Sequence, residues 1–155
     1  MNLDWIEAGP EHPLLFRLYT TGRQQEVEHW GWDEAQLQTF LQMQYRFQQQ
    51  SYAMQYPGSR LYIIQLDGQD AGKVHVAQTD EEWVLVDIAV LPEQRGSGIG
   101  SRIIRRIQEQ AAEQGKPVRL TVAAGNPAAR LYERLEFKLD SYNELHAVMR
   151  WYPKQ

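Results

Sequence analysis

One stretch, residues 87–107, constrains the fold of this chain more than any other part of the sequence. An apolar run at 84–91 is typical of a strand, and Pro92 ends it because proline has no backbone N–H for a sheet ladder. Beyond a group of glycines, apolar residues recur at helical spacing from Ile99 to Ala111, which predicts a helix with one buried stripe. A strand, a glycine-rich turn and an amphipathic helix therefore follow one another directly.

The turn between this strand and this helix is typical of an anion-binding site. Glycines allow consecutive N–H groups to point into one concavity, and the helix N-terminus adds a partial positive charge. Arg95 and Arg102 stand at either end of the turn and could add full charges. The glycines alternate from Gly96 to Gly100, so the spacing fits neither the G-x-G-x-x-G dinucleotide pattern nor the P-loop.

The turn fits the pattern R-x-x-G-x-G over residues 95–100, and the letters DIAVLPE precede it. This stretch resembles the pyrophosphate-binding motif of the GNAT superfamily of N-acetyltransferases, which bind acetyl-coenzyme A. A second match, NPAARLYERLEF at 126–137, is similar to the family pattern N-x-x-A-x-L-Y-x-x-x-G-F. It departs at Glu136, where glycine is usual and is expected to end the helix in a left-handed conformation. Glutamate in that conformation should cost about 1 kcal/mol of stability.

The composition predicts one soluble globular domain spanning residues 1–155. Hydrophobic residues make up 43% and charged residues 23% of the chain, and no apolar run approaches the roughly 20 residues that span a bilayer. The first residues have no signal-peptide core, so we expect a cytoplasmic protein without a membrane partner. A net charge of −4 argues against nucleic acid as a partner. The histidines have no metal-ligand spacing, which predicts no metal site.

Hydrophobic periods and turn signals predict the element order β-α-α-β-β-β-α-β-α-β-β, a mixed α/β (α+β) layout. Asp33 with Gln36 predicts a capping box at the start of the second helix, whereas the end of the first helix is unclear. The resemblance implies a GNAT-like, mostly antiparallel central sheet flanked by helices. The strands are predicted at 3–6, 60–66, 71–77, 84–91, 118–123, 137–140 and 145–151. The helices are predicted from 14, with an end that falls at 19 or as late as 29, at 33–56, at 99–111 and from 127.

The resemblance also implies where the coenzyme binds. The backbone of Ile88 and Val90 would pair with the amides of the pantetheine arm, and the strands at 84–91 and 118–123 would splay apart to admit it. The amides of residues 94–100 would hold the pyrophosphate. The predicted coenzyme-binding residues are Ile88, Val90, Gln94, Arg95, Gly96, Ser97, Gly98, Ile99, Gly100, Ser101, Arg102, Asn126 and Tyr132.

Two catalytic roles follow from the resemblance. Tyr132 matches the tyrosine that donates a proton to the departing thiolate, and a phenol with a pKa near ~10 suits that role. The backbone N–H of Val90 is the candidate donor to the developing oxyanion. With no cysteine in the chain, direct transfer in a ternary complex is expected and not an acyl-cysteine intermediate.

No general base stands out. Several family members place a Glu or His on this strand, but the matching positions are Val84 and Val86, which cannot serve. Strict strand alternation predicts that Asp87 points to the opposite face, where it would act as a structural hydrogen-bond acceptor. Two alternatives are proton transfer to Glu26, Glu28 or His29 and proton transfer through waters.

The predicted acceptor residues are Glu28, Trp30, Trp32 and Trp83, with Tyr45 and Tyr52 as further aromatic candidates. Ordinary packing is the competing interpretation for each ring.

The resemblance predicts an acetyl-coenzyme A-dependent N-acetyltransferase that acts on the primary amine of a small molecule. A peptide N-terminus or a lysine side chain is the alternative acceptor. Two non-enzymatic alternatives are an acyl-coenzyme A-binding module and a nucleotide-phosphate binder without acyl chemistry. Many small relatives are dimers, so a homodimer is among the expected assemblies.

Overall fold

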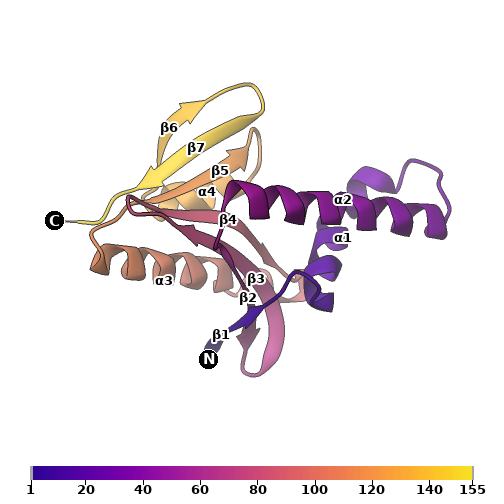
Figure 1. The fold of residues 1–155 in the computed structure, drawn as a ribbon, viewed down its shortest axis with the longest axis horizontal. Coiled ribbons are helices and arrows are strands. Elements are labelled where there is room, and N and C mark those ends of the chain that lie inside the picture. Colours follow the sequence, from indigo (N-terminus) through magenta and orange to yellow (C-terminus); the bar gives the residue numbers. More distant parts are fainter. Residues whose placement is uncertain (1, 155) are drawn as a thin grey trace.

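The computed structural model describes residues 2–154, apart from the side chain of Gln25, and has seven strands in one sheet of order β1-β2-β3-β4-β5-β7-β6 (Figure 1). Among these strands, only the β4–β5 pair is parallel. This arrangement confirms the predicted element order and mixed architecture, with one additional 3₁₀ turn. The elements are β1 (Leu3–Ala8), α1 (Pro13–Val27), α2 (Glu34–Gln55), β2 (Arg60–Leu66), β3 (Gln69–Gln78), β4 (Trp83–Val90), η1 (Pro92–Gln94), α3 (Ile99–Glu113), β5 (Val118–Ala123), α4 (Ala128–Arg134), β6 (Lys138–Tyr142) and β7 (His146–Trp151).

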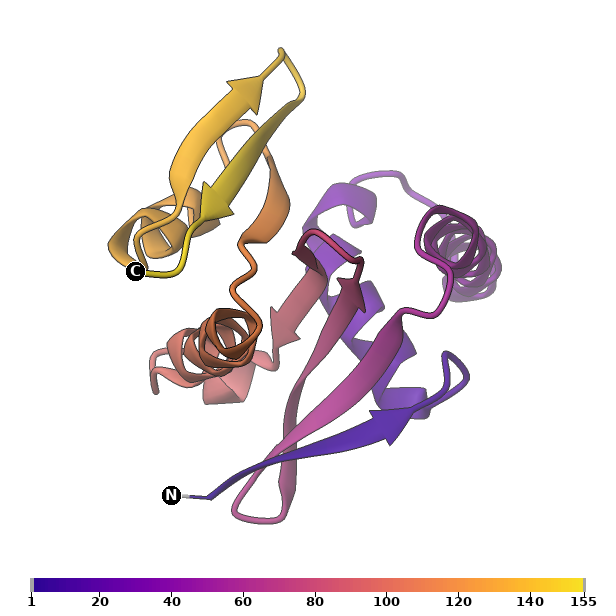
Figure 2. The same ribbon diagram turned by 60° about the vertical axis from the view of Figure 1, so that its left-hand side comes forward.

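Helices cover both faces of the sheet, with α3 and α4 on one side and α1 and α2 on the other (Figure 2). The side that carries α3 and α4 is the α3 face of the sheet, and the other side is the α1/α2 face. The predicted isoleucine stripe of α3 is buried in the larger of two apolar cores, which α4 also enters. The second, smaller core lies between α1, α2 and the α1/α2 face.

The two N-terminal helices differ in how well their ends could be predicted. The capping box of α2 is present, because Asp33 accepts from the Gln36 amide at 2.8 Å and the Gln36 side chain accepts from the Asp33 amide at 3.2 Å. Helix α1 continues through Thr20 and Thr21, whose hydroxyls both donate to the Arg17 carbonyl at 2.9 Å. Burial of its leucines keeps this helix intact where propensity alone is weak.

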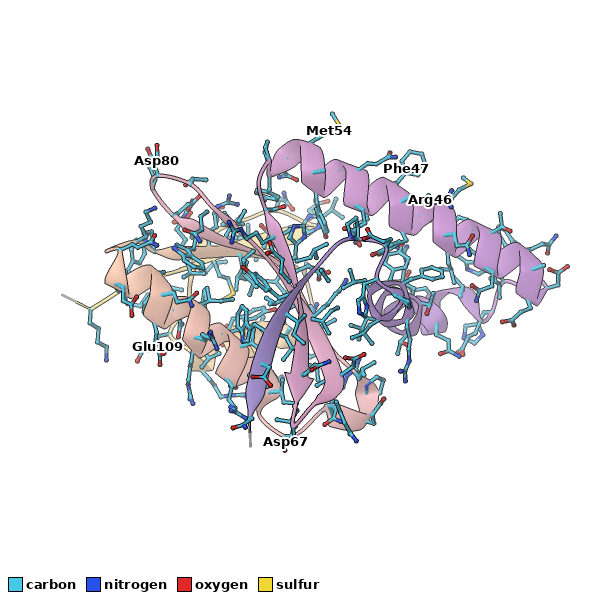
Figure 3. All side chains as sticks on the ribbon, turned by 60° about the horizontal axis from the view of Figure 1, so that its bottom comes forward. Arg46, Phe47, Met54, Asp67, Asp80 and Glu109 are labelled. Carbon is cyan, nitrogen blue, oxygen red and sulfur yellow. The ribbon has the colours of Figure 1, made fainter. Side chains whose placement is uncertain are left out.

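Helix α2 is mostly solvated. Phe47 and Met54 point away from the sheet and are 62% and 83% exposed (Figure 3), whereas only Leu41 and Tyr45 are buried. Its glutamine-rich surface therefore fits the interpretation of a solvent-facing helix side. Among residues 2–154, no helix has both the length and the apolar character that crossing a bilayer requires.

A β-bulge at Val86 changes the direction of every side chain that follows it in β4. His75 of β3 lies opposite Asp87, but the next residue, Val76, lies opposite Leu85, so Val86 is an extra residue. As a result Ile88 packs in the α3 core and Ala89 in the α1/α2 core. Asp87 therefore shares the α1/α2 face with Val84, and the prediction from strict alternation that it points to the opposite face was wrong.

The end of α4 confirms the predicted left-handed residue. Glu136 has φ of 71°, and its neighbour Phe137 donates its amide to the Tyr132 carbonyl at 3.0 Å. Phe137 is 2% exposed. The buried Gln108 side chain of α3 also donates to the Leu135 carbonyl at 2.9 Å. These contacts hold the chain in this conformation although glutamate disfavours it.

Candidate active site

The edge of β4 that faces β5 is open along most of its length. The two strands pair at three positions, from Trp83–Val118 to Leu85–Leu120, and then diverge. Residues 86–90 of β4 pair with none of the described strands on this side, which confirms the predicted splay. An unpaired parallel edge inside a sheet exposes backbone donors and acceptors to whatever enters the gap.

Hydrogen bonds at the two ends of β4 show which of its amides face this gap. The Trp83 amide donates toward β5, to the Pro117 carbonyl at 2.9 Å, whereas the Leu91 amide donates toward β3, to Ala71 at 2.8 Å. Because backbone direction alternates along a strand, the amides of Val90 and Ile88 point toward the open side. These are the two residues predicted to pair with the pantetheine arm.

The glycine-rich turn lies directly beyond the open edge. Gly96 and Gly98 have φ of 83° and 80°, a region that favours glycine, and a Cβ built on either would meet no atom within 4 Å. The turn is thus set by backbone conformation and leaves open space above the N-terminus of α3. The first amides of α3 have no acceptor within their own helix and are available to an anion. Ile99, Gly100 and Ser101 supply this first turn.

Several groups of the predicted anion-binding turn already form hydrogen bonds within the protein. The Gln94 amide donates to the Leu91 carbonyl at 2.9 Å and the Arg95 amide to Pro92 at 3.2 Å. The Arg95 side chain donates to the Val90 carbonyl at 3.3 Å, and the Ser97 hydroxyl to the Gln94 carbonyl at 2.6 Å. The candidate anion-binding site therefore narrows to the amides from Gly96 onward.

The second motif packs against the first through α3 and α4. A Cβ at Gly100 would lie 3.7 Å from a methyl group of Leu131, so the two helices approach closely there. The side-chain oxygen of Asn126 accepts from the Ala128 amide at 2.9 Å just before α4, and its side-chain amide group can still donate to a ligand. Tyr132 is 8% exposed, and its ring lies 6.0 Å from that of Phe137.

A polar cluster lies on the α1/α2 face of the sheet, beside the open edge. Lys73 Nζ contacts Asp87 Oδ2 at 2.9 Å; the lysine side chain is 4% exposed and the aspartate side chain 30%. His75 Nε2 lies 2.7 Å from the Ser59 hydroxyl, and its Nδ1 is buried without a hydrogen-bond partner among the described residues. The Tyr52 ring packs edge-on against His75 at 5.3 Å.

The electrostatics of this cluster keep its ring groups neutral. Burial lowers the pKa of His75 to about 4. Burial, followed by Glu11 and Asp87, raises the pKa of Tyr45 to about 12. Burial, followed by Asp87, raises the pKa of Tyr52 to about 12. Burial and then Asp87 also raise the pKa of Tyr132 above its usual value. The Asp87 carboxylate contributes to the pKa shifts of all four groups.

Of the predicted acceptor residues, Tyr52 lies at this cluster, whereas Glu28 and the three tryptophans lie away from it. Trp30 and Trp32 pack against each other at 5.2 Å, and both contact Phe40. Glu28 forms an exposed pair with His29. Trp83 lies on the α3 face, where its indole donates to Gln114 at 3.1 Å. Within residues 2–154, no group of three or more candidate ligands could hold a metal ion.

Sequence reasoning missed Lys73 and His75. Both belong to the run AGKVHVA, in which polar residues alternate with Val74 and Val76. Polar residues at alternate positions of a central, otherwise apolar strand should face one site together. That signal was available in the sequence.

The model of the family described as the acetyltransferase (GNAT) domain matches residues 57–139. This match covers more than half of the chain, which therefore belongs to the GNAT acetyltransferase family. It includes the open edge of β4, the glycine-rich turn and Tyr132. No curated protein sequence matches the chain significantly.

Solved structures share the fold. PaiA N-acetyltransferase from Thermoplasma acidophilum, in complex with coenzyme A, has a TM-score of 0.70 at 12% identity, over 98% of this chain and 99% of that chain. Campylobacter jejuni N-acetyltransferase PseH, in complex with acetyl-coenzyme A, has a TM-score of 0.62 at 13% identity, over 99% and 100%. Nourseothricin acetyltransferase has a TM-score of 0.53 at 27% identity, over 63% and 67%.

Proposed function

We propose that this protein is an N-acetyltransferase that moves an acetyl group from acetyl-coenzyme A to the primary amine of a small molecule, by direct transfer in a ternary complex. The observation that supports this proposal best is the open edge of β4, which leads directly to a glycine-rich helix N-terminus.

The residues of the site fit coenzyme A. Its pantetheine arm has amides that need partners when buried, and the amides of Ile88 and Val90 face the gap. Its pyrophosphate is an anion, and the open space above Gly96 and Gly98 adjoins the first amides of α3. When bound, acetyl-coenzyme A supplies the acetyl group as a thioester. Two neighbours solved with this coenzyme or its free form support the assignment.

Tyr132 fits the role of general acid. Its raised pKa means that the phenol keeps its proton at neutral pH and can donate it to a departing thiolate. Its position on α4 follows from the contacts of Leu131 and Phe137, which fix the helix against α3 and the sheet. The Val90 amide, on the other side of the gap, would stabilise negative charge on the acetyl carbonyl oxygen.

Asp87 is the best candidate to accept the amine proton. The bulge at Val86 turns its carboxylate toward the α1/α2 face, and bulges often redirect a side chain in this way beside active sites. Lys73 holds one carboxylate oxygen, while the side chain keeps 30% exposure through which an amine can approach. His75 is buried and neutral, and its pKa of about 4 makes it a much weaker base than an ordinary histidine.

The same cluster supports an amine as the acceptor. The positive charge of Lys73 and the negative charge of Asp87 cancel each other. A neutral or singly protonated amine therefore meets no net positive charge at this pair. The phenols of Tyr45 and Tyr52 lie near the carboxylate and offer aromatic faces suited to an ammonium group. A peptide N-terminus or a lysine side chain remains the alternative acceptor.

Release of free coenzyme A tests the proposal. Purified protein is incubated with acetyl-coenzyme A and a panel of small amines, and thiol release is followed. Tyr132→Phe should reduce turnover at least ~10-fold and leave coenzyme affinity unchanged, since it removes only the proton donor. The matched control is Tyr142→Phe, because Tyr142 is 78% exposed on β6; it should leave both unchanged.

Other outcomes point to the alternatives. Turnover confined to peptide or protein amines would assign the acceptor to the peptide class. Tight acetyl-coenzyme A binding without turnover of small amines or of peptide and protein amines would indicate a binding module. Equal turnover by wild type and Tyr132→Phe would remove the tyrosine from the mechanism.

A further inference from the structure

A second hollow, of about 480 Å³, lies on the α3 face of the sheet and is separate from the open edge of β4. Its volume is within the range of small-molecule sites. Strands β1 to β4 form the floor and α3 forms one wall. Aromatic rings, guanidinium groups and two side-chain amides line it, among them Trp5, Tyr62, Trp83, Arg60, Arg106 and Gln110.

This hollow is remote from the proposed coenzyme site. Arg106 lies eight residues beyond Gly98, which corresponds to about 12 Å along a helix. Trp83 lies five residues before Ile88, which corresponds to about 16 Å along a strand. A ligand here would therefore touch neither the glycine-rich turn nor the open part of β4.

Aromatic rings give the hollow flat apolar surfaces. Trp5 and Tyr62 pack edge to face, with ring centroids 5.4 Å apart. Trp83 is 5% exposed, and its indole N–H is held by Gln114 at 3.1 Å, which fixes the ring at the base of the site. Rings held in place by neighbours lose little entropy when a planar ligand stacks on them.

The charged lining is cationic. Arg60 and Arg106 line the hollow, and no carboxylate does so among the described residues, in a chain of net charge −4. The Arg106 guanidinium lies 5.1 Å from the Trp5 ring centroid. The Glu7 carboxylate approaches Arg60 only to 3.9 Å, with both side chains more than 60% exposed, so water screens this pair.

One donor in the lining lacks an acceptor. The Trp5 indole N–H is buried and has no hydrogen-bond partner within residues 2–154. Because this N–H is closed to solvent, a ligand in the hollow would not reach it, and recognition rests on the guanidinium groups. A carboxylate provides two acceptor oxygens and matches the guanidinium groups of Arg60 and Arg106.

We propose that this hollow binds a small aromatic carboxylate. The ring lies against Trp5, Tyr62 and Trp83, and the carboxylate is bound by Arg60 and Arg106. This site is additional to the acetyl-transfer site, and its ligand is not consumed by the reaction proposed above.

NMR spectroscopy of the ¹⁵N-labelled full chain tests this proposal without acetyl-coenzyme A, so its result is independent of the proposed function. The chain has five tryptophans, of which Trp5 and Trp83 line the hollow while Trp30, Trp32 and Trp151 do not. Titration with benzoate should shift the indole N–H signals of the first two saturably and leave the other three in place. Benzylamine, with the same ring and opposite charge, and cyclohexanecarboxylate, with the same charge and no aromatic face, are the comparison probes.

Substitutions on α3 separate charge recognition from general effects. Arg106→Gln should weaken benzoate binding about 10-fold or more, because a charge-assisted hydrogen bond is lost. Arg105→Gln, one position along the same helix and outside the hollow, should leave the affinity unchanged. The proposal is overturned if benzoate shifts no pocket tryptophan, if either comparison probe binds as well, or if Arg106→Gln retains wild-type affinity.

Discussion

Removing either partner of the Lys73–Asp87 pair should destabilise the protein, and by different amounts. The two charges are 2.9 Å apart, but the Lys73 side chain is 4% exposed and that of Asp87 is 30% exposed. Asp87→Asn leaves a buried ammonium group without its counter-charge, a change that typically costs about 3–5 kcal/mol. Lys73→Met leaves a carboxylate that water still reaches and fills the vacated volume with an apolar chain, so about 1–2 kcal/mol is expected.

Urea unfolding followed by tryptophan fluorescence measures both changes at neutral pH. The double variant should recover much of the larger loss, since neither charge then remains buried. Asp80→Asn, in the exposed turn before β4, is the control and should change stability by less than about 0.5 kcal/mol. If Lys73→Met proves as costly as Asp87→Asn or more so, the unequal burial of the two charges does not govern this pair.

Three further changes test other parts of the structure. Glu136→Gly should raise the free energy of unfolding by about 1 kcal/mol, because Glu136 is held at φ 71°; no gain would show that its side chain compensates. Gly98→Ala should lower the free energy of unfolding by about 1 kcal/mol and weaken acetyl-coenzyme A binding. The control Gly22→Ala, inside a helix, should raise the free energy of unfolding by about 0.5–1 kcal/mol. Equal effects of the two substitutions would contradict the role of the turn. The pKa of His75 is lowered to about 4, so this ring takes up a proton more readily in the unfolded chain than in the folded one. The free energy of unfolding should therefore fall by about 2 kcal/mol from about pH 7.5 to about pH 5. His75→Gln should remove most of that fall.

Local patterns were sufficient to predict most of the architecture. Strand β2 and strand β5 have the predicted ends, because apolar runs and flanking turn residues mark them in the sequence. The capping box at Asp33 depends on two nearby residues and was equally predictable, whereas the left-handed residue at Glu136 was expected from the family pattern. The β4–β5 splay was expected from the family resemblance and not from the residues themselves.

The orientation of Asp87 could not be predicted in this way. It depends on one extra residue in β4, and nothing in the letters around Val86 marks a bulge. The error affected the search for a general base, because a one-residue change moves a side chain to the other face of a sheet. Trp83 illustrates a second limit, since residue type suggested an acceptor role and the fold places the ring on the α3 face.

Isothermal titration with acetyl-coenzyme A, with ADP as the comparison ligand, tests the central claim most directly. We predict micromolar binding of acetyl-coenzyme A, at least ~10-fold tighter than that of ADP, because the pantetheine arm adds contacts along residues 86–90 that ADP cannot make. Equal affinity for the two ligands would contradict this claim, since it would show that the open edge of β4 contributes nothing to binding.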